Sequence, residues 1–317
     1  MQPEFLFVVG IGRSGTSLLQ NMLAGHSAIS FLPESSFLRR YAFSRAFDKG
    51  VGAGDLPAFA KTLADDVAFK RLGFSAEQVQ EMLASPEGGR GAGFFRRAAY
   101  RFGPPTQGAV YLGDKDPRLI EYLPSLKAAF PSAKVVHIYR DPRDVFLSKS
   151  RADWAKGRTA FAYAFAGRVQ WELVRRTGEA LFGENFYELA YERLIDSPDE
   201  EMSKLCRFLS LSLEPAMLHP SEGGGALVAK DELAWKKETL GPILAANTGK
   251  WRTGLAPSQI VLVERISRRL MRDVGYETSS LAGDLDPIAR ASISLQALAA
   301  NLLSTVYCRL RLWSQHT

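Results

Sequence analysis

The segment FLFVVGIGRSGTSLL near the N-terminus contains two phosphate-binding spacings at once. Gly10, Gly12 and Gly15 have the spacing G-x-G-x-x-G of a dinucleotide-binding turn. The same segment also fits a P-loop, in which Thr16 stands where nucleoside-triphosphate enzymes carry a lysine and Ser17 follows it. Both spacings predict a loop that holds a phosphate group, and they differ in which molecule carries that phosphate.

Two departures from the P-loop pattern indicate what this loop holds. Phosphoryl transfer from a nucleoside triphosphate needs the loop lysine and a strand-end Asp that supports magnesium, but here Thr16 replaces the lysine and the strand VVHIY ends in Arg140. A sulfuryl group carries less charge than a phosphoryl group, so cationic side chains without a metal ion can support its transfer. Backbone N–H groups of Ser14 and Gly15, the hydroxyls of Thr16 and Ser17, and the charge of Arg13 would then hold a single 5′-phosphate.

The elements that position this loop follow an α/β pattern. FLFVV predicts a strand buried on both faces, SLLQNMLAG a helix, and AISFL a second strand, which together form one βαβ unit. Residues 41–108 contain helical segments, which we interpret as an inserted subdomain or lid. VYLGDKDPR and AKVVHIY then return to the strand pattern. We predict a P-loop-kinase-like, mostly parallel sheet with helices on both faces. The helical insertion would lie over the site of the molecule that accepts the sulfuryl group.

Four stretches together resemble the family of sulfotransferases that use 3′-phosphoadenosine 5′-phosphosulfate (PAPS). GIGRSGTSLL is similar to the 5′-phosphosulfate loop of that family, and YRDPRDVFLSKS resembles the signature whose Arg and Ser hold the 3′-phosphate, here Arg140 and Ser148. LAYERLIDSP is similar to a segment that places Tyr191 near the adenine. TGKWRTGL resembles a C-terminal loop that closes on the nucleotide, and its candidate residues are Lys250, Trp251 and Arg252.

The base assignment depends on a difference within that family. Phenol and steroid sulfotransferases use a His in a K-x-H stretch, whereas the comparable place here reads GDKDPR and contains Lys115. FLPESSF and GDKDP instead resemble tyrosylprotein and carbohydrate sulfotransferases, which implies Glu34 as the base. The resemblance thus implies that Glu34 removes the acceptor proton while Arg13 and Lys115 neutralise charge on the departing phosphate oxygen.

Each assignment has a structural alternative. Glu34 follows the second strand, so it could anchor a ribose in a nicotinamide-dependent Rossmann oxidoreductase, or it could be a solvated loop acid. Arg140 could form a salt bridge with Asp144, Lys115 could pair with a neighbouring Asp, and Trp251 could serve ordinary packing. A non-catalytic nucleotide-binding protein with the same fold is a further alternative.

Composition limits the partners. The chain has 317 residues, a net charge of +6 and a pI near 9.3, which suggests an anionic partner. The resemblance implies PAPS as co-substrate without a metal, and an acceptor hydroxyl on a carbohydrate, tyrosyl peptide, lipid or small alcohol rather than a nucleic acid.

The two cysteines, Cys206 and Cys308, provide no disulfide framework. Because the first strand leaves no room for a signal peptide and no apolar run reaches about 20 residues, we expect a soluble, cytoplasmic protein without a membrane span, although an excised luminal domain would have the same features.

The chain divides at Pro287 into a predicted sulfotransferase domain, residues 1–286, and a basic amphipathic helix, residues 287–317. The second part contains no acidic residue. Its helical stripe consists of Leu295, Leu298, Leu302, Val306 and Leu310. We expect this stripe to pack on the body of the protein or on a partner subunit of a homodimer, with binding to a membrane surface as the alternative.

Overall fold

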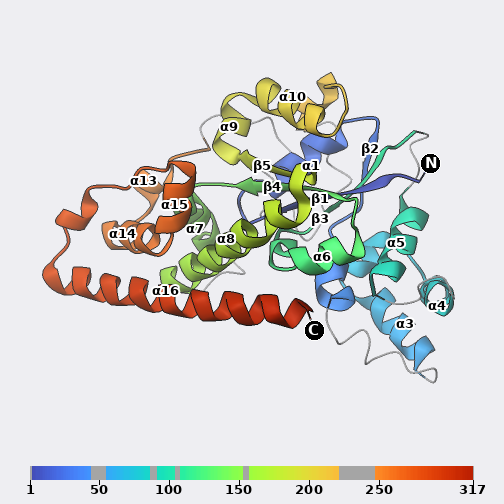
Figure 1. Cartoon of the computed structure of the whole chain (residues 1–317), viewed down its shortest axis with the longest axis horizontal. Coiled ribbons are helices and arrows are strands. Elements are labelled where there is room, and N and C mark those ends of the chain that lie inside the picture. Colours follow the sequence, from blue (N-terminus) through green and yellow to red (C-terminus); the bar gives the residue numbers. More distant parts are fainter. Residues whose placement is uncertain are drawn as a thin grey trace.

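A computed structural model of the chain describes residues 2–43, 55–85, 91–103, 108–152, 157–220 and 247–316. Its centre is a sheet of five parallel strands in the order β2-β3-β1-β4-β5 (Figure 1). The strands are β1 (Glu4–Gly10), β2 (Ile29–Phe31), β3 (Tyr111–Lys115), β4 (Lys134–Tyr139) and β5 (Phe186–Ala190). The predicted α/β class and parallel sheet are therefore confirmed.

The strand order also decides between the two phosphate-binding interpretations. In a dinucleotide-binding fold the second strand lies beside the first, in the order 3-2-1-4-5-6. Here β3 lies between β1 and β2, and Leu6 pairs with Gly113 on one side and with Lys134 of β4 on the other. This arrangement excludes the Rossmann oxidoreductase alternative.

Helices cover both faces of the sheet because alternate residues of β1 enter different cores. Leu6 and Val8 pack with α1 (Thr16–Ala24), α9 (Tyr191–Asp196) and α10 (Pro198–Phe208). Phe5, Phe7 and Val9 face the other way, toward α6 (Leu123–Ala129) and α8 (Ala160–Phe182). The segment NFYELAYERL is a strand only as far as Ala190, and α9 begins at Tyr191.

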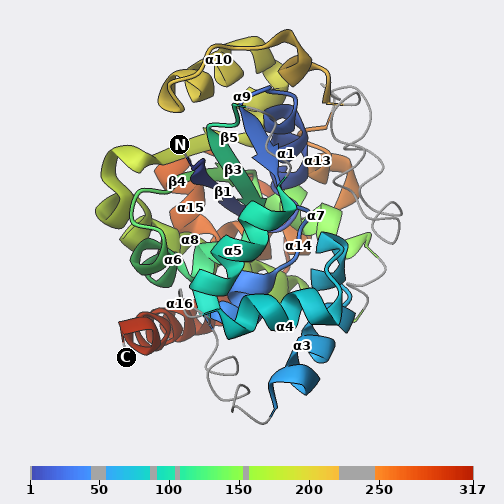
Figure 2. The same cartoon turned by 90° about the vertical axis from the view of Figure 1, so that its right-hand side faces the viewer.

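The predicted insertion is helical in its described parts and lies between β2 and β3. It contains α3 (Leu56–Asp65), α4 (Ala76–Ala84) and α5 (Gly91–Phe102), besides the short helices η1 (Leu38–Ala42) and η2 (Phe69–Leu72) (Figure 2). Residues 44–54, 86–90 and 104–107 of this region lie outside the described residues. Phe69 and Phe94 belong to the same aromatic core as Phe5 and Phe7, with Phe37 at 5.3 Å from Phe69 and 5.2 Å from Phe94 between ring centres. The insertion is thus built into the core.

The C-terminal part consists of helices that pack around α7 (Pro142–Ser150) and α8. These are α13 (Trp251–Gly254), α14 (Pro257–Ile266), α15 (Arg268–Val274) and α16 (Pro287–His316). Four further short helices are η3 (Pro117–Glu121), η5 (Gly183–Asn185), η6 (Pro215–Leu218) and η10 (Leu281–Gly283). The two cysteines are free and buried.

Of the two packing arrangements predicted for the stripe of α16, packing on the body of the protein is not observed, and packing on a partner subunit stays a prediction. The large side chains of its stripe do not pack on the body of the protein: Leu295, Leu302 and Leu310 are 68%, 62% and 61% exposed. The helix packs through its opposite face, where small residues such as Ala300 and Ser304 allow close approach. By length and composition, Pro287–Gln315 could cross a membrane, so the predicted absence of a membrane span stays a prediction.

Candidate active site

The loop between β1 and α1 needs two of its three glycines. A Cβ on Gly10 would lie 2.5 Å from the carbonyl oxygen of Ile138, and one on Gly15 would lie 2.3 Å from the ring of Tyr191. Gly15 also has a φ of 99°, a left-handed conformation that glycine adopts without strain. Gly12, in contrast, faces open space. The glycines that the backbone requires are those of the P-loop spacing.

The loop presents hydrogen-bond donors at the N-terminus of α1. The first N–H groups of a helix have no partner within it, and the first turn of α1 contains no acidic residue. Among the described residues, the hydroxyls of Thr16 and Ser17 have no protein partner. Ser14 is different, because its buried hydroxyl donates to Ile138 O at 3.0 Å and its N–H donates to Ile11 O at 2.9 Å. Ser14 therefore ties the loop to β4.

The two residues predicted to hold the 3′-phosphate lie beside this loop. Nε of Arg13 donates to the hydroxyl of Ser148 at 2.9 Å, across 135 positions of sequence. Arg140 donates to the carbonyl oxygens of Asn247 at 2.5 Å and of Arg13 at 3.4 Å. Nε of Arg140 is buried without a hydrogen-bond partner among the described residues. A buried charged donor in that state provides a place for an anion.

Tyr191 lies against Arg140, and Asn247 forms a hydrogen bond with Tyr191. The guanidinium of Arg140 lies 4.3 Å from the centre of the Tyr191 ring, and Nδ2 of Asn247 donates to the Tyr191 hydroxyl at 2.8 Å. Asn247 has no signature in the sequence, because its link to Tyr191 spans 56 positions and belongs to no local pattern. The structure thus brings Arg13, Arg140, Ser148 and Tyr191 together around the phosphate loop.

Glu34 and Lys115 meet at the same edge of the sheet. Lys115 is the last residue of β3 and pairs in register with Val8, two residues before the loop begins at Gly10. Glu34 follows β2, the next strand along, and its carboxylate accepts a hydrogen bond from Nζ of Lys115. The Lys115 side chain is 1% exposed and that of Glu34 is 19% exposed. The carboxylate of Glu34 can therefore meet a ligand from solvent while Lys115 lies behind it.

Two further acids surround this ion pair. Burial, reinforced by the charges of Asp116 and Glu34, raises the pKa of Asp114 to about 8, so this carboxyl group is largely protonated at neutral pH. Asp116 accepts from Nε of Arg39 at 3.0 Å and from the N–H of Arg118 at 3.0 Å. Lys115 forms an ion pair with Glu34, and its charge also acts on the neighbouring Asp114, where it opposes the rise in pKa.

The TGKWRTGL segment is held by a carboxylate of α7. Asp144 accepts from the N–H groups of Gly249 at 2.7 Å and Trp251 at 2.9 Å. Asp144 therefore fixes the backbone of this segment, and Arg140 donates to the carbonyl oxygens of Asn247 and Arg13 instead of forming the salt bridge with Asp144 that the sequence left open.

The side chain of Trp251 packs inside the protein. It is buried between two guanidinium groups, with Arg143 at 3.7 Å and Arg252 at 4.5 Å from its ring, while Lys250 is exposed. These contacts match the packing alternative for Trp251. A nucleotide-closing role for Lys250, Trp251 and Arg252 stays a prediction.

Lys149 is a candidate that the sequence analysis missed. It follows Ser148 in the same signature, it is buried, and its ammonium lies 5.7 Å from the ring of Tyr163. Burial, together with the charges of Arg13, Arg118 and Arg158, lowers the pKa of Lys149 to about 8. An anion bound beside Arg13 would favour the charged form of Lys149 and would be attracted by it.

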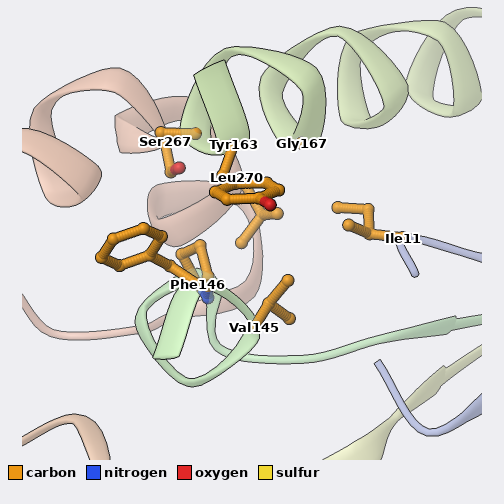
Figure 3. A pocket seen from close by; sticks show the side chains of 9 residues that line it. Ile11, Val145, Phe146, Tyr163, Gly167, Ser267 and Leu270 are labelled. Atoms are coloured by element: carbon orange, nitrogen blue, oxygen red, sulfur yellow. The ribbon is translucent and has the colours of Figure 1, made fainter. Parts of the chain in front are cut away.

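A cavity lies behind the phosphate loop, but it is too small for an acceptor. Its volume is about 20 Å³, which is enough for one water molecule. Ile11 points toward it from the loop, opposite Phe146 and Tyr163 (Figure 3). Its lining residues are Ile11, Pro142, Val145, Phe146, Tyr163, Ala164, Gly167, Ser267 and Leu270. This cavity is therefore too small to hold a substrate.

Comparison with known proteins decides the family. Residues 3–215 match the sulfotransferase family. The chain belongs to the sulfotransferase family. The predicted recognition, enzyme class and sulfuryl-transfer function are thereby confirmed, and this family match favours an enzyme over the alternative of a non-catalytic nucleotide-binding protein.

The chain is also similar to a protein-tyrosine sulfotransferase, to an uncharacterized protein and, in its fold, to a solved sulfotransferase domain. Protein-tyrosine sulfotransferase 1 of Danio rerio is 23% identical over 283 residues, which cover 86% of this chain and 72% of that protein. An uncharacterized protein of Aquifex aeolicus is 25% identical over 232 residues, which cover 67% of this chain but only 26% of that protein. The sulfotransferase domain from the curacin biosynthetic pathway has the same fold, with a TM-score of 0.61 at 20% identity, covering 88% of this chain and 99% of that domain.

Proposed function

We propose that this sulfotransferase uses PAPS as donor and transfers its sulfuryl group to an acceptor hydroxyl with Glu34 as general base. One observation carries the proposal. The Glu34–Lys115 pair and the phosphate loop lie at the same carboxyl edge of the sheet, where ligands of parallel α/β proteins bind. One bound molecule could therefore contact the carboxylate of Glu34, the buried ammonium of Lys115 and the hydrogen-bond donors of the phosphate loop.

The residues around the loop have the chemistry that such a nucleotide needs. The α1 N-terminus, Thr16 and Ser17 would hold the 5′-phosphate. Nε of Arg140, which has no hydrogen-bond partner in the described part of the chain, would hold the 3′-phosphate together with Ser148. When bound, PAPS supplies an activated sulfuryl group.

Each residue near the reacting atoms would have a separate chemical role, which follows from its position. Glu34 accepts the proton of the acceptor hydroxyl. Lys115 and Arg13 stabilise the charge that remains on the phosphate oxygen. Lys115 also keeps Glu34 oriented through their hydrogen bond, so the base requires no rearrangement before it meets the acceptor.

The relatives suggest a tyrosyl hydroxyl as the acceptor to test first. Several of them are protein-tyrosine sulfotransferases, from Danio rerio to Homo sapiens. A phenolic hydroxyl has a pKa near 10, which a carboxylate base deprotonates more readily than an alkyl alcohol. Carbohydrate, lipid and small alcohol acceptors are the alternatives, and sulfate-labelled PAPS with pooled acceptors of each class distinguishes them.

The same assay tests metal independence. We expect labelled sulfate transfer to proceed at the same rate in excess EDTA, because Thr16 replaces the P-loop lysine and β4 is followed by Arg140 rather than a magnesium-binding acid. Added magnesium after EDTA serves as the control. Activity that disappears in EDTA and returns with magnesium would contradict the proposed mechanism.

A further inference from the structure

Most large apolar side chains of the C-terminal helix α16 face solvent instead of the core. Its outer face carries Ile288, Leu295, Leu298, Leu302, Leu303, Val306, Tyr307, Leu310 and Trp313, all of them 43% to 83% exposed. We call these nine residues the outer stripe. A contiguous exposed stripe of this kind marks an interaction surface rather than ordinary surface composition.

The inner face of α16 is fixed to the body of the protein by small and polar groups. Ser304 is buried and accepts from Nε of Arg168 at 2.8 Å, while Asn301 also accepts from Arg168. Gln315 donates to the carbonyl oxygen of Glu121 at 2.7 Å, and the guanidinium of Arg311 lies 3.9 Å from the ring of Tyr122. These contacts at the middle and end of the helix hold its outer stripe toward solvent.

The position of α16 makes the whole stripe accessible. In Figure 1 the helix runs along the lower edge of the molecule, beneath α8, and Figure 2 shows it at the same edge nearly end-on. It packs against α14, α8 and α6. A helix of 30 residues is about 45 Å long, so the stripe is a long, narrow surface at one edge.

The charge around the stripe indicates what covers it. Residues 287–317 contain no acid, and Arg290 and Arg309 are exposed on α16 itself. Together, α6, α8, α14 and α16 contain eight Lys or Arg residues and three Glu residues, of which Glu172 and Glu264 are buried in ion pairs. The exposed acids Asp284 and Asp286 lie just before α16, so the excess positive charge belongs to α16 itself.

That combination fits a lipid surface better than a second copy of the chain. Two copies joined through the outer stripe would bring two basic surfaces together, with no acid in the tail to pair with the partner's arginines. The apolar acyl-chain region of an anionic bilayer would accommodate the leucines, and its negative headgroups would attract the arginines. Tyr307 and Trp313 are amphipathic rings of the type that lies at the boundary between headgroups and acyl chains.

We propose that α16 lies in the plane of an anionic lipid surface and attaches this sulfotransferase to it through the outer stripe. A membrane-spanning arrangement would instead expose Ser304, Asn301 and Gln315 to acyl chains after breaking their contacts with the body of the protein.

Vesicle flotation with the whole chain tests this proposal. We expect the protein to float with phosphatidylcholine vesicles that contain phosphatidylglycerol, to bind phosphatidylcholine alone more weakly, and to lose binding in high salt. The double variant Leu302→Gln/Leu310→Gln should bind at least about tenfold more weakly, because it removes two buried leucines from the lipid contact. Val67→Gln/Val110→Gln is the matched control, since these valines are 68% and 45% exposed away from α16, and it should bind like the wild type.

Three outcomes would overturn the proposal. The first is equal flotation of the wild type and the Leu302→Gln/Leu310→Gln variant, or no flotation at all. The second is a dimer in light scattering that the same variant converts to a monomer without any vesicle binding. The third is retention in vesicles through alkaline carbonate extraction, which indicates a membrane span. Equal urea midpoints for both double variants and the wild type would show that the exposed substitutions leave the fold intact.

Discussion

Glu34→Gln is expected to lower the turnover number by about 10²–10⁴-fold while leaving the affinity for adenosine 3′,5′-bisphosphate nearly unchanged. Glutamine keeps the shape of the side chain and a hydrogen-bonding oxygen for Lys115, but it cannot accept the proton of the acceptor. Labelled sulfate transfer at saturating donor measures the first quantity, and calorimetric titration measures the second.

The matched control for this variant is Glu81→Gln. Glu81 also forms an ion pair, with Arg101 at 3.0 Å, but its side chain is 69% exposed on the insertion. This substitution should leave both turnover and nucleotide affinity unchanged. If Glu34→Gln weakens nucleotide binding by an order of magnitude and spares turnover at saturation, Glu34 is not the base.

Arg143→Met is expected to lower the free energy of unfolding by about 3–5 kcal/mol. The guanidinium of Arg143 is buried and donates to both carboxylate oxygens of Asp141, to Glu264 at 2.7 Å and to the carbonyl oxygen of Glu277 at 2.9 Å. Burial opposes its charge, but the hydrogen bonds and charges of Asp141 and Glu264 outweigh that effect and raise the pKa of Arg143. Methionine would leave the two acids buried without their shared partner.

Urea unfolding measures this loss, and Arg272→Met is the control. The Arg272 side chain is 73% exposed and lies 3.8 Å from Asp273, so its removal should change the unfolding free energy by less than about 0.5 kcal/mol. A change of similar size in both variants would contradict the role assigned to the buried network of Arg143. Should Arg143→Met fail to fold, Glu264→Gln tests the same network with the guanidinium retained, and it should also be less stable than the wild type.

The sequence predicted the local parts of the site because each part is a continuous pattern. The phosphate loop joins a strand to a helix within a few residues, and Arg140 and Ser148 lie on one strand end and the helix that follows it. Glu34 and Lys115 were assigned through family resemblance. Their contact depends on β2 lying beside β3, which no local pattern specifies.

The parts that the sequence did not predict are contacts between distant segments. Asp144 binds backbone N–H groups of Gly249 and Trp251, more than 100 positions away, and backbone donors have no sequence signature. Lys149 became a candidate only when its burial beside Arg13 was visible. The periodicity of α16 correctly indicated a two-sided helix, but it could not specify that the small-residue side would pack inward.

The preference for a 3′-phosphate is the central claim about the nucleotide site. Calorimetric titration should show that the wild-type protein binds adenosine 3′,5′-bisphosphate at least about tenfold more tightly than 5′-AMP, because each charge-assisted hydrogen bond to that phosphate contributes roughly 1.5–3 kcal/mol. Arg140→Ala should abolish most of this preference, since it removes the buried guanidinium whose Nε has no protein partner among the described residues. Equal affinities of the wild type for the two nucleotides would contradict the account.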